Sequence, residues 1–172
     1  MLPLGHLAFT WGTLHALQRA GKFPDADYRL AALAALAPDV LDKPLAMFVL
    51  RRSNAALLFG HTLLMHALVW LAAGRKRRQW LPYLLAFSGH LLEDRIWGFP
   101  QTFLWPLRGP SFHQWRHVGS PAAFLDAYRQ VVRQEPKLVI FELLGLVILI
   151  WTIVERGWYR PARLIQLLWE GR

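Results

Sequence analysis

A long apolar run near the C-terminus constrains the fold of this chain most strongly. Residues Leu138–Val154 (LVIFELLGLVILIWTIV) carry a single ionisable side chain, Glu142. A helix needs about 20 mostly apolar residues to cross a bilayer. Arg156, Trp158 and Tyr159 follow the run, and residues of these types anchor helices in the headgroup layer. The run therefore predicts a transmembrane helix.

Four further segments are candidates to join this helix in a membrane. Asn54–Ala73 and Trp80–Trp97 are long enough but contain polar residues, Leu30–Leu50 is long but interrupted, and Leu2–Leu17 is shorter. Hydrophobic residues make up 55% of the chain, more than in soluble domains. We therefore expect one all-α domain over residues 1–172, a polytopic integral membrane helical bundle with four or five transmembrane helices.

Two prolines, Pro38 and Pro44, interrupt the segment Leu30–Leu50. Proline lacks a backbone N–H and disfavours helix at the residue before it, so this helix is expected to be broken at Pro38–Pro44. Unpaired carbonyls at membrane depth are tolerated where they are buried in protein or line a wet cavity. A break here therefore predicts a polar site, although transporters use broken helices as well.

The distribution of basic residues predicts how the segments are oriented. Arg75–Arg78 (RKRR) is the strongest positive cluster and is expected on the cytoplasmic side, although Arg51 and Arg52 then fall outside. In this arrangement residues 98–136 form an external loop or lid. Residues 157–172 form an interfacial C-terminal tail.

Charge and cysteine content limit the possible partners. The net charge is +9, and the cations lie at the ends of apolar segments, which favours membrane lipids and argues against nucleic acid. The chain has no cysteine, so any metal must be bound by nitrogen and oxygen. The N-terminus lacks the features of a secretory signal, so Met1 is expected in the mature protein. The oligomeric state is left open.

Ionisable residues inside the apolar segments predict a polar site. Each costs about 2.5 kcal/mol or more in lipid, so such residues are rare unless they have a function. His90 and Asp94 are four residues apart and share a helix face. Asp39 and His61 lie in two other segments at compatible heights, and His6 lies near the start of the first segment. We predict that these five residues converge on one metal.

Simpler interpretations exist for each of these residues. His90 and Asp94 can form a hydrogen-bonded pair, and Lys43 can form a local ion pair with the neighbouring carboxylates. Asp42 is predicted to be a ligand, a ligand-orienting group or the acceptor of the catalytic proton. Glu93 is predicted to be a ligand-orienting group, a general base or a solvated residue at the membrane edge.

The segment Phe99–Pro121 is rich in proline, glycine and aromatic residues and is typical of an interfacial lid. His113 and His117 in this segment can bind metal or contact headgroups, whereas His15 and His66 are interpreted as structural. Three arginines in or near the segment are predicted to hold an anionic headgroup: Arg95, Arg108 and Arg116.

Five short motifs resemble the YdjM-like family of inner-membrane metal-dependent hydrolases. In order they are Gly5-His-Leu7, Ala37–Pro44 (APDVLDKP), Gly60–Leu64 (GHTLL), Ser88–Asp94 (SGHLLED) and Pro100–Pro106 (PQTFLWP), within about residues 1–110. The resemblance implies an integral protein of a bacterial or archaeal cytoplasmic (inner) membrane with one or two divalent ions, Zn²⁺ being favoured. The implied ligands are His6, Asp39, His61, His90 and Asp94, with Asp42 as a sixth candidate.

The chain departs from the common family pattern in two places, and both bear on a second ion. A His-Arg pair usually precedes the Gly-His motif, whereas Ala56–Phe59 (ALLF) stands here. The paired aspartates Asp39 and Asp42 are three residues apart rather than two.

These observations lead to a hydrolase as the main hypothesis. A bound metal would lower the pKa of a water and polarise a phosphoryl or carbonyl oxygen, while Asp42 or Glu93 takes the proton. The substrate, a small molecule or a lipid, would be a phosphoester or lipid-like, and a lipid-derived phosphoester is favoured because the site is expected to open where headgroups lie. One alternative is a metal-binding transporter, which the small number of helices and the absence of a visible repeat disfavour. Another is a non-catalytic scaffold with a structural metal, which would have a saturated coordination sphere.

Overall fold

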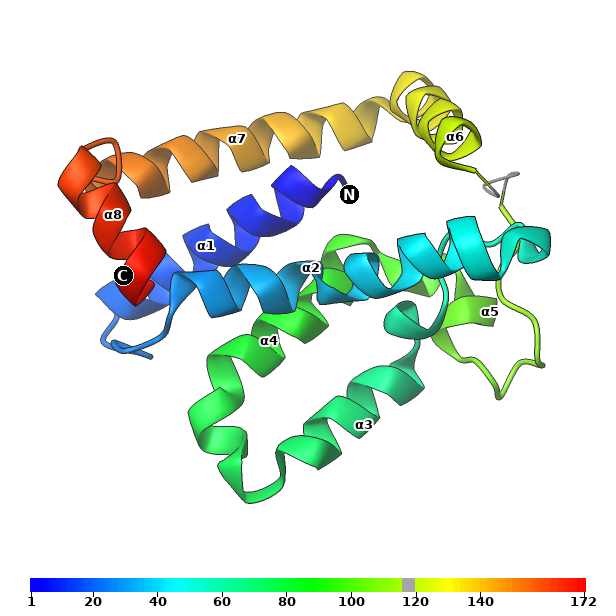
Figure 1. The fold of residues 1–172 in the computed structure, drawn as a ribbon, viewed down its shortest axis with the longest axis horizontal. Coiled ribbons are helices and arrows are strands. Elements are labelled where there is room, and N and C mark those ends of the chain that lie inside the picture. The colour runs from blue at the N-terminus through cyan, green and yellow to red at the C-terminus, as the bar shows by residue number, and fades with distance from the viewer. Residues whose placement is uncertain (116–119) are drawn as a thin grey trace.

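The protein is described by a computed structural model that covers residues 1–115 and 120–172. Over these residues the chain is helical and contains no strand, which confirms the all-α prediction (Figure 1). The α-helices are α1 (Pro3–Arg19), α2 (Tyr28–Pro44), α3 (Leu63–Ala73), α4 (Arg77–Glu93), α5 (Pro100–Phe103), α6 (Pro121–Gln134), α7 (Pro136–Arg156) and α8 (Pro161–Glu170).

Local sequence signals account for most of the helix starts. Proline occupies the beginning of α1, α5, α6, α7 and α8, where its missing N–H is not needed and its fixed φ suits a helix. The side chain of Asp27 caps α2 by accepting hydrogen bonds from the N–H groups of Arg29 and Leu30. Thr62 caps α3 by accepting from the N–H of Met65.

Helix α7 is the only helix in the described parts of the chain that is long and apolar enough to cross a membrane. It has 21 residues, and only 11% of its apolar window is buried inside the protein, so most of its side chains face outwards. A core helix of a soluble protein would be mostly buried. The helix predicted over Leu138–Val154 is therefore confirmed, whereas four or five spans are not.

The segment Asn54–Ala73 departs from its predicted helix. Only Leu63–Ala73 is α-helical, because the chain before it runs irregularly and contains one 3-10 turn, η3 (Phe59–His61). At 11 residues, α3 is too short to cross a bilayer unaided.

The predicted break at Pro38–Pro44 is wrong. Helix α2 continues through Pro38 to Pro44, and the irregularity follows it as a π-helical turn, η1 (Leu45–Val49), in which the N–H of Leu50 donates to the carbonyl of Leu45 over 2.7 Å. Packing explains the difference, because α2 is in contact with both α1 and α4. A proline removes one hydrogen bond, and tertiary contacts compensate for it.

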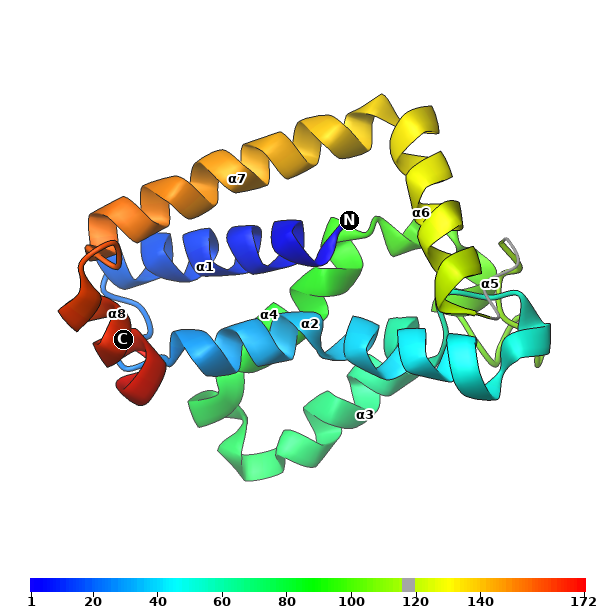
Figure 2. The ribbon, with the colours of Figure 1, turned by 45° about the horizontal axis from the view of Figure 1, so that its top comes forward.

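Helix α1 lies along α7 in both views (Figures 1 and 2). Small residues allow this close approach: a Cβ added at Gly145 would lie 3.5 Å from the Cα of Gly5 and from the Cβ of Ala8. Small residues at helix contacts are the usual way in which membrane helices pack closely. Glu142 adds a polar contact, since its Oε1 accepts a hydrogen bond from the N–H of Leu2 over 2.7 Å. This contact fixes the start of α1, which carries His6.

The C-terminal residues include helix α8, which docks against the start of α2. The N–H of Tyr28 donates to the carbonyl of Gly171 over 2.8 Å, and Arg29 donates to the carbonyls of Leu168 and Trp169 over 2.9 and 2.8 Å. A buried cluster lies beneath α8 and includes Leu14, Ala26, Tyr28, Ala31, Trp158 and Leu167.

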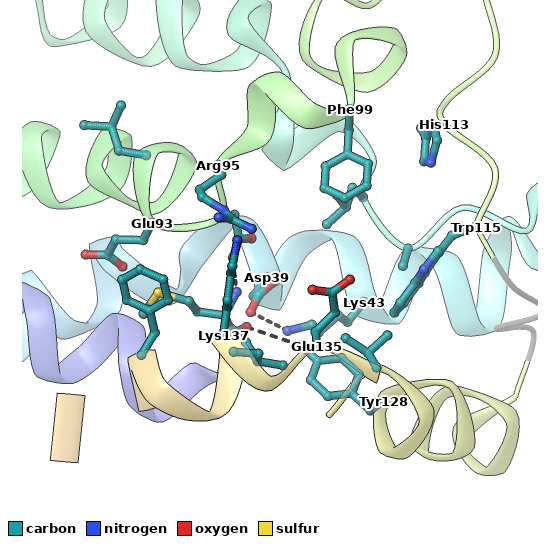
Figure 3. A pocket seen from close by; sticks show the side chains of 18 of the residues that line it. Asp39, Lys43, Glu93, Arg95, Phe99, His113, Trp115, Tyr128, Glu135 and Lys137 are labelled. Carbon is teal, nitrogen blue, oxygen red and sulfur yellow. Dashed lines mark hydrogen bonds and ion pairs between the residues drawn. The ribbon is translucent and has the colours of Figure 1, made fainter. Parts of the chain in front are cut away.

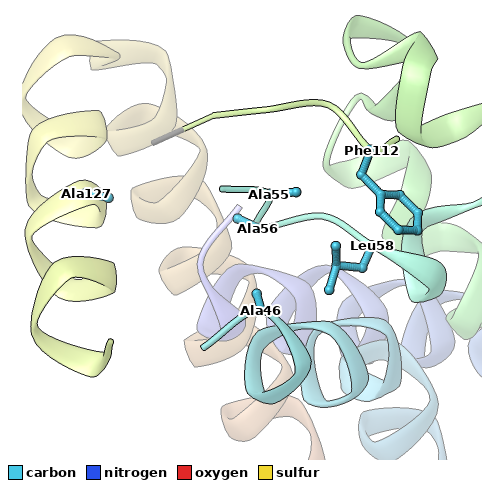
Figure 4. Close-up of a cluster of buried hydrophobic side chains, with 6 residues drawn as sticks. All are labelled: Ala46, Ala55, Ala56, Leu58, Phe112 and Ala127. Carbon is cyan, nitrogen blue, oxygen red and sulfur yellow. The ribbon is translucent and has the colours of Figure 1, made fainter. Parts of the chain in front are cut away.

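The predicted external loop, residues 98–136, contains two helices, α5 and α6. In Figure 2, α6 runs from the start of α7 towards the far end of α2. A second buried cluster lies there and joins η1, the irregular segment before η3, the α5–α6 connection and α6 (Figure 4): Ala46, Ala55, Ala56, Leu58, Phe112 and Ala127. This packing positions α6 over the site described next.

Candidate metal centre

Four of the predicted ligands converge from three segments. Asp39 comes from α2, His61 from η3, His90 from α4, and Asp94 follows the end of α4. One ligand atom of each lies within 4.8 Å of the other three. The predicted convergence is thus seen for these four residues, while metal binding itself stays a prediction.

The separations in this cluster suit a single ion. The Nε2 atoms of His61 and His90 are 3.1 Å apart, and the Oδ2 of Asp94 lies 3.3 and 3.4 Å from them. The Oδ1 of Asp39 lies 3.7 and 3.8 Å from the same two nitrogens. Ligand atoms about 2.0–2.1 Å from a tetrahedral zinc ion are roughly 3.3 Å apart. Nitrogen and oxygen donors at these distances fit Zn²⁺ or a similar divalent cation.

Hydrogen bonds at the opposite ring nitrogen set the tautomer of both histidines. The Nδ1–H of His61 donates to the Oδ2 of Asp42 over 2.7 Å, and that of His90 donates to the carbonyl of Ala35 over 2.7 Å. Each Nε2 therefore faces the cluster. Two ring nitrogens 3.1 Å apart need either a shared proton or a cation between them.

His6 is held in the same way beside the cluster. Its Nδ1–H donates to the Oε2 of Glu93 over 2.6 Å, and its ring stacks on that of His90 with centroids 3.9 Å apart. Its buried Nε2 has no hydrogen-bond partner in the described residues and lies 3.2 Å from the Oδ1 of Asp94. Asp94 thus faces the four-atom cluster with one oxygen and His6 with the other.

Asp42 lies behind His61 rather than in the cluster. It is fully buried, and it also accepts hydrogen bonds from the N–H groups of Leu58 (2.6 Å) and Gly60 (2.7 Å). Three donors already engage this carboxylate, and it does not line the cavity described below. This geometry favours the ligand-orienting alternative for Asp42, whereas its roles as metal ligand and as acceptor of the catalytic proton stay predictions.

A close backbone contact holds the His61 segment against α2. A Cβ at Gly60 would lie 2.7 Å from the carbonyl oxygen of Pro38, so only glycine lets this segment approach α2 so closely. The carbonyl of Gly60 in turn accepts a hydrogen bond from the Nε2–H of His66 over 3.0 Å. The structural interpretation of His66 agrees with this contact.

A cavity of about 710 Å³ adjoins the cluster, with Asp39, Glu93 and Asp94 in its wall (Figure 3). Three further lining residues are cations: Arg95, Lys137 and Lys43, the last of which forms an ion pair with Asp39. The remaining wall contains one more carboxylate, Glu135, and is otherwise largely apolar, with the aromatic residues Phe9, Trp97, Phe99, Trp115, Tyr128 and Phe141. The cavity therefore combines charges near the cluster with an apolar wall.

The other residues predicted to contact a substrate headgroup or a metal do not all lie at the cavity. Arg108 is exposed and does not line the cavity, so the structure does not bring it to the site. Arg116 and His117 lie outside the described residues. His113 lines the cavity with its ring 5.1 Å from that of Phe99, and it is not part of the four-atom cluster.

Sequence reasoning missed the contribution of α6 and of the start of α7. Tyr128 and Lys137 line the cavity, and the ring of Tyr128 lies 5.5 Å from the Nζ of Lys43. Burial raises the pKa of Tyr128, although Lys43 acts in the opposite direction, so the phenol stays protonated at neutral pH. Phe124, Tyr128 and Val131 recur at helical spacing and are the signal that could have identified this face.

Comparison with known proteins gives one match. The family described as "YdjM inner membrane protein" matches residues 1–159. None of the curated proteins and none of the solved structures matches the chain significantly.

Proposed function

This chain belongs to the YdjM inner membrane protein family, and we propose that it is a membrane-bound metal-dependent hydrolase. The proposed substrate is a phosphoester or lipid-like molecule. The proposed location is the cytoplasmic (inner) membrane of a bacterium or archaeon, with α1, α2 and α4 embedded beside α7.

One observation carries the proposal: Asp39 and Asp94 belong both to the ligand cluster and to the wall of the cavity. Asp39, His61, His90 and Asp94 would hold the cation, with His6 beside them, and the ion would border a cavity able to admit a substrate. When bound, a divalent ion such as Zn²⁺ supplies Lewis acidity and lowers the pKa of a water towards neutrality.

The surrounding residues have separate tasks in this proposal. Asp42 holds His61 in its ligating tautomer. Glu93 holds His6 and also lines the cavity, so it is the carboxylate best placed to accept a proton. Lys43 and Arg95 lie where they can bind an anionic group of the substrate.

Elemental analysis of detergent-purified protein tests the metal. We expect bound divalent metal in the wild type and in His15→Ala, and little in His61→Ala and Asp94→Ala. His15 is a matched control because it is buried on α1 but lies outside the cluster. Equal, near-zero metal in all four proteins would end the proposal.

Hydrolysis of phosphoester substrates, with and without chelator, tests the activity. We expect activity that chelator removes, that added Zn²⁺ restores and that His61→Ala lacks. Metal that is retained without any hydrolysis would favour the structural scaffold. Metal that crosses a proteoliposome membrane would favour the transporter.

A further inference from the structure

We infer that the substrate is a membrane-resident amphiphile with a phosphate headgroup, and that it enters the cavity sideways from the lipid. The entrance lies between the end of α4 and the first turns of α7. This inference rests on the proposed function, because it names the substrate class for the same site.

Apolar residues mark the entrance. Leu92, Trp97 and Phe141 line the cavity and are also 68%, 58% and 41% exposed. A side chain that belongs to an inner wall and to the outer surface marks an opening between the two. Phe141 lies on α7, the helix fit to cross the membrane, so the opening faces the layer that α7 occupies. Exposed apolar side chains of this kind suit contact with a lipid chain.

The inner end of the cavity is built for an anion. Lys43 and Arg95 reach it from α2 and from the link after α4, and Figure 3 shows both around the same space. Two of the four carboxylates that line the cavity are engaged, Asp39 by Lys43 and Glu93 by His6; the other two are Asp94 and Glu135. A phosphate placed here would lie between the two cations Lys43 and Arg95, a setting that favours its negative charge.

The volume of the cavity supports a lateral exit for the hydrocarbon chain of the substrate. About 710 Å³ is within the range of roughly 300–1,000 Å³ that encloses a drug-sized ligand. A headgroup and part of one chain fit inside, and the rest of the chain must leave through the opening. A water-soluble phosphoester would not need the exposed apolar rim.

Photo-crosslinking tests this inference without turnover. The probe is a single-chain alkyl phosphate with a diazirine midway along its chain, added to metal-free protein in lipid bicelles. The reference probe has the same chain and an uncharged hydroxyl head. We expect the phosphate probe to label peptides containing Leu92, Trp97 or Phe141 at least about tenfold more strongly than the reference.

Variants and competitors sharpen the result. Arg95→Gln and Lys43→Gln should reduce labelling by the phosphate probe several-fold, whereas Arg108→Gln should not. Leu92→Trp should narrow the entrance and reduce labelling, whereas Leu85→Trp should not, since Leu85 is exposed on α4 but does not line the cavity. Unlabelled dodecyl phosphate should compete at least about tenfold better than glycerol phosphate.

Three outcomes would overturn the inference: equal labelling by the uncharged probe, labelling confined to other residues, or equal competition by glycerol phosphate, which would indicate a substrate taken from water. Because the readout is binding to metal-free protein, absence of hydrolysis would refute the proposed function without altering this result. Conversely, active protein without lateral labelling would refute only the inference.

Discussion

The Nδ1 of His61 lies 2.7 Å from the Oδ2 of Asp42, and both side chains are completely buried. The same carboxylate accepts hydrogen bonds from the backbone N–H groups of Leu58 and Gly60. One acid on α2 therefore fixes both the path of the irregular segment and the ring nitrogen that His61 offers. The histidine acquires its ligating orientation as the segment docks.

Replacing Asp42 by Asn should weaken metal binding by about 10–100-fold, because the amide cannot accept from all the donors that now surround it. A competitive chelator titration measures the affinity. Glu155→Gln is the control and should bind like the wild type, because Glu155 pairs with Arg19 and belongs to neither the cluster nor the cavity wall. An affinity unchanged in Asp42→Asn would show that this carboxylate does not orient His61.

Replacing His6 by Ala should leave the number of bound ions unchanged and weaken their binding by about tenfold at most, because His6 lies beside the four-atom cluster. His90→Ala removes a member of that cluster and should abolish binding at micromolar metal. Metal content and affinity are measured together at saturation. Loss of one ion from two in His6→Ala would instead show that His6 holds a second ion.

Gly60→Ala should destabilise the protein by about 1–3 kcal/mol, since the added Cβ would meet the carbonyl oxygen of Pro38 at 2.7 Å. Gly89→Ala is the matched comparison, because a Cβ there meets nothing within 4 Å and alanine is favoured inside a helix. Thermal unfolding is followed by circular dichroism. The melting temperature should fall in Gly60→Ala and not in Gly89→Ala. Equal melting of both variants would contradict the close contact.

Asp27 should make stability depend on acid pH. Burial acts to raise the pKa of Asp27, but hydrogen bonds from the Arg29 side chain and from two backbone N–H groups outweigh it and hold the pKa below the ordinary 3.8. The stabilisation is therefore complete above about pH 4 and is lost as the pH falls through the folded-state pKa.

Asp27→Ala removes this cap and should cost about 1 kcal/mol at neutral pH. Its melting temperature should fall less than that of the wild type when the pH drops from 5 to 3. Asp25→Ala is the nearby control and should follow the wild type. Parallel pH curves for Asp27→Ala and the wild type would contradict the assignment.

The sequence was most informative about ionisable residues in apolar segments, because burying such residues costs free energy. His61, His90, Asp39 and Asp94 could be singled out because they lie in apolar segments, and both lipid and the protein interior penalise an unpartnered charge. Glu93, predicted as a group near the site, lines the cavity and accepts a hydrogen bond from His6. The proline rule was less reliable: it predicted a break at Pro38 that packing against two neighbouring helices prevents.

The sequence by itself determined the helical class, the apolar helix α7 and the donor atoms available to a cation, because these depend on composition and local spacing. Only the tertiary structure decided which donors face one another. It placed Asp42 behind His61, left Arg108 outside the cavity and brought α6 with Tyr128 over Lys43. Such pairings depend on contacts between segments far apart in the chain, and the close approach at Gly60 sets one of them. No local pattern encodes that distance.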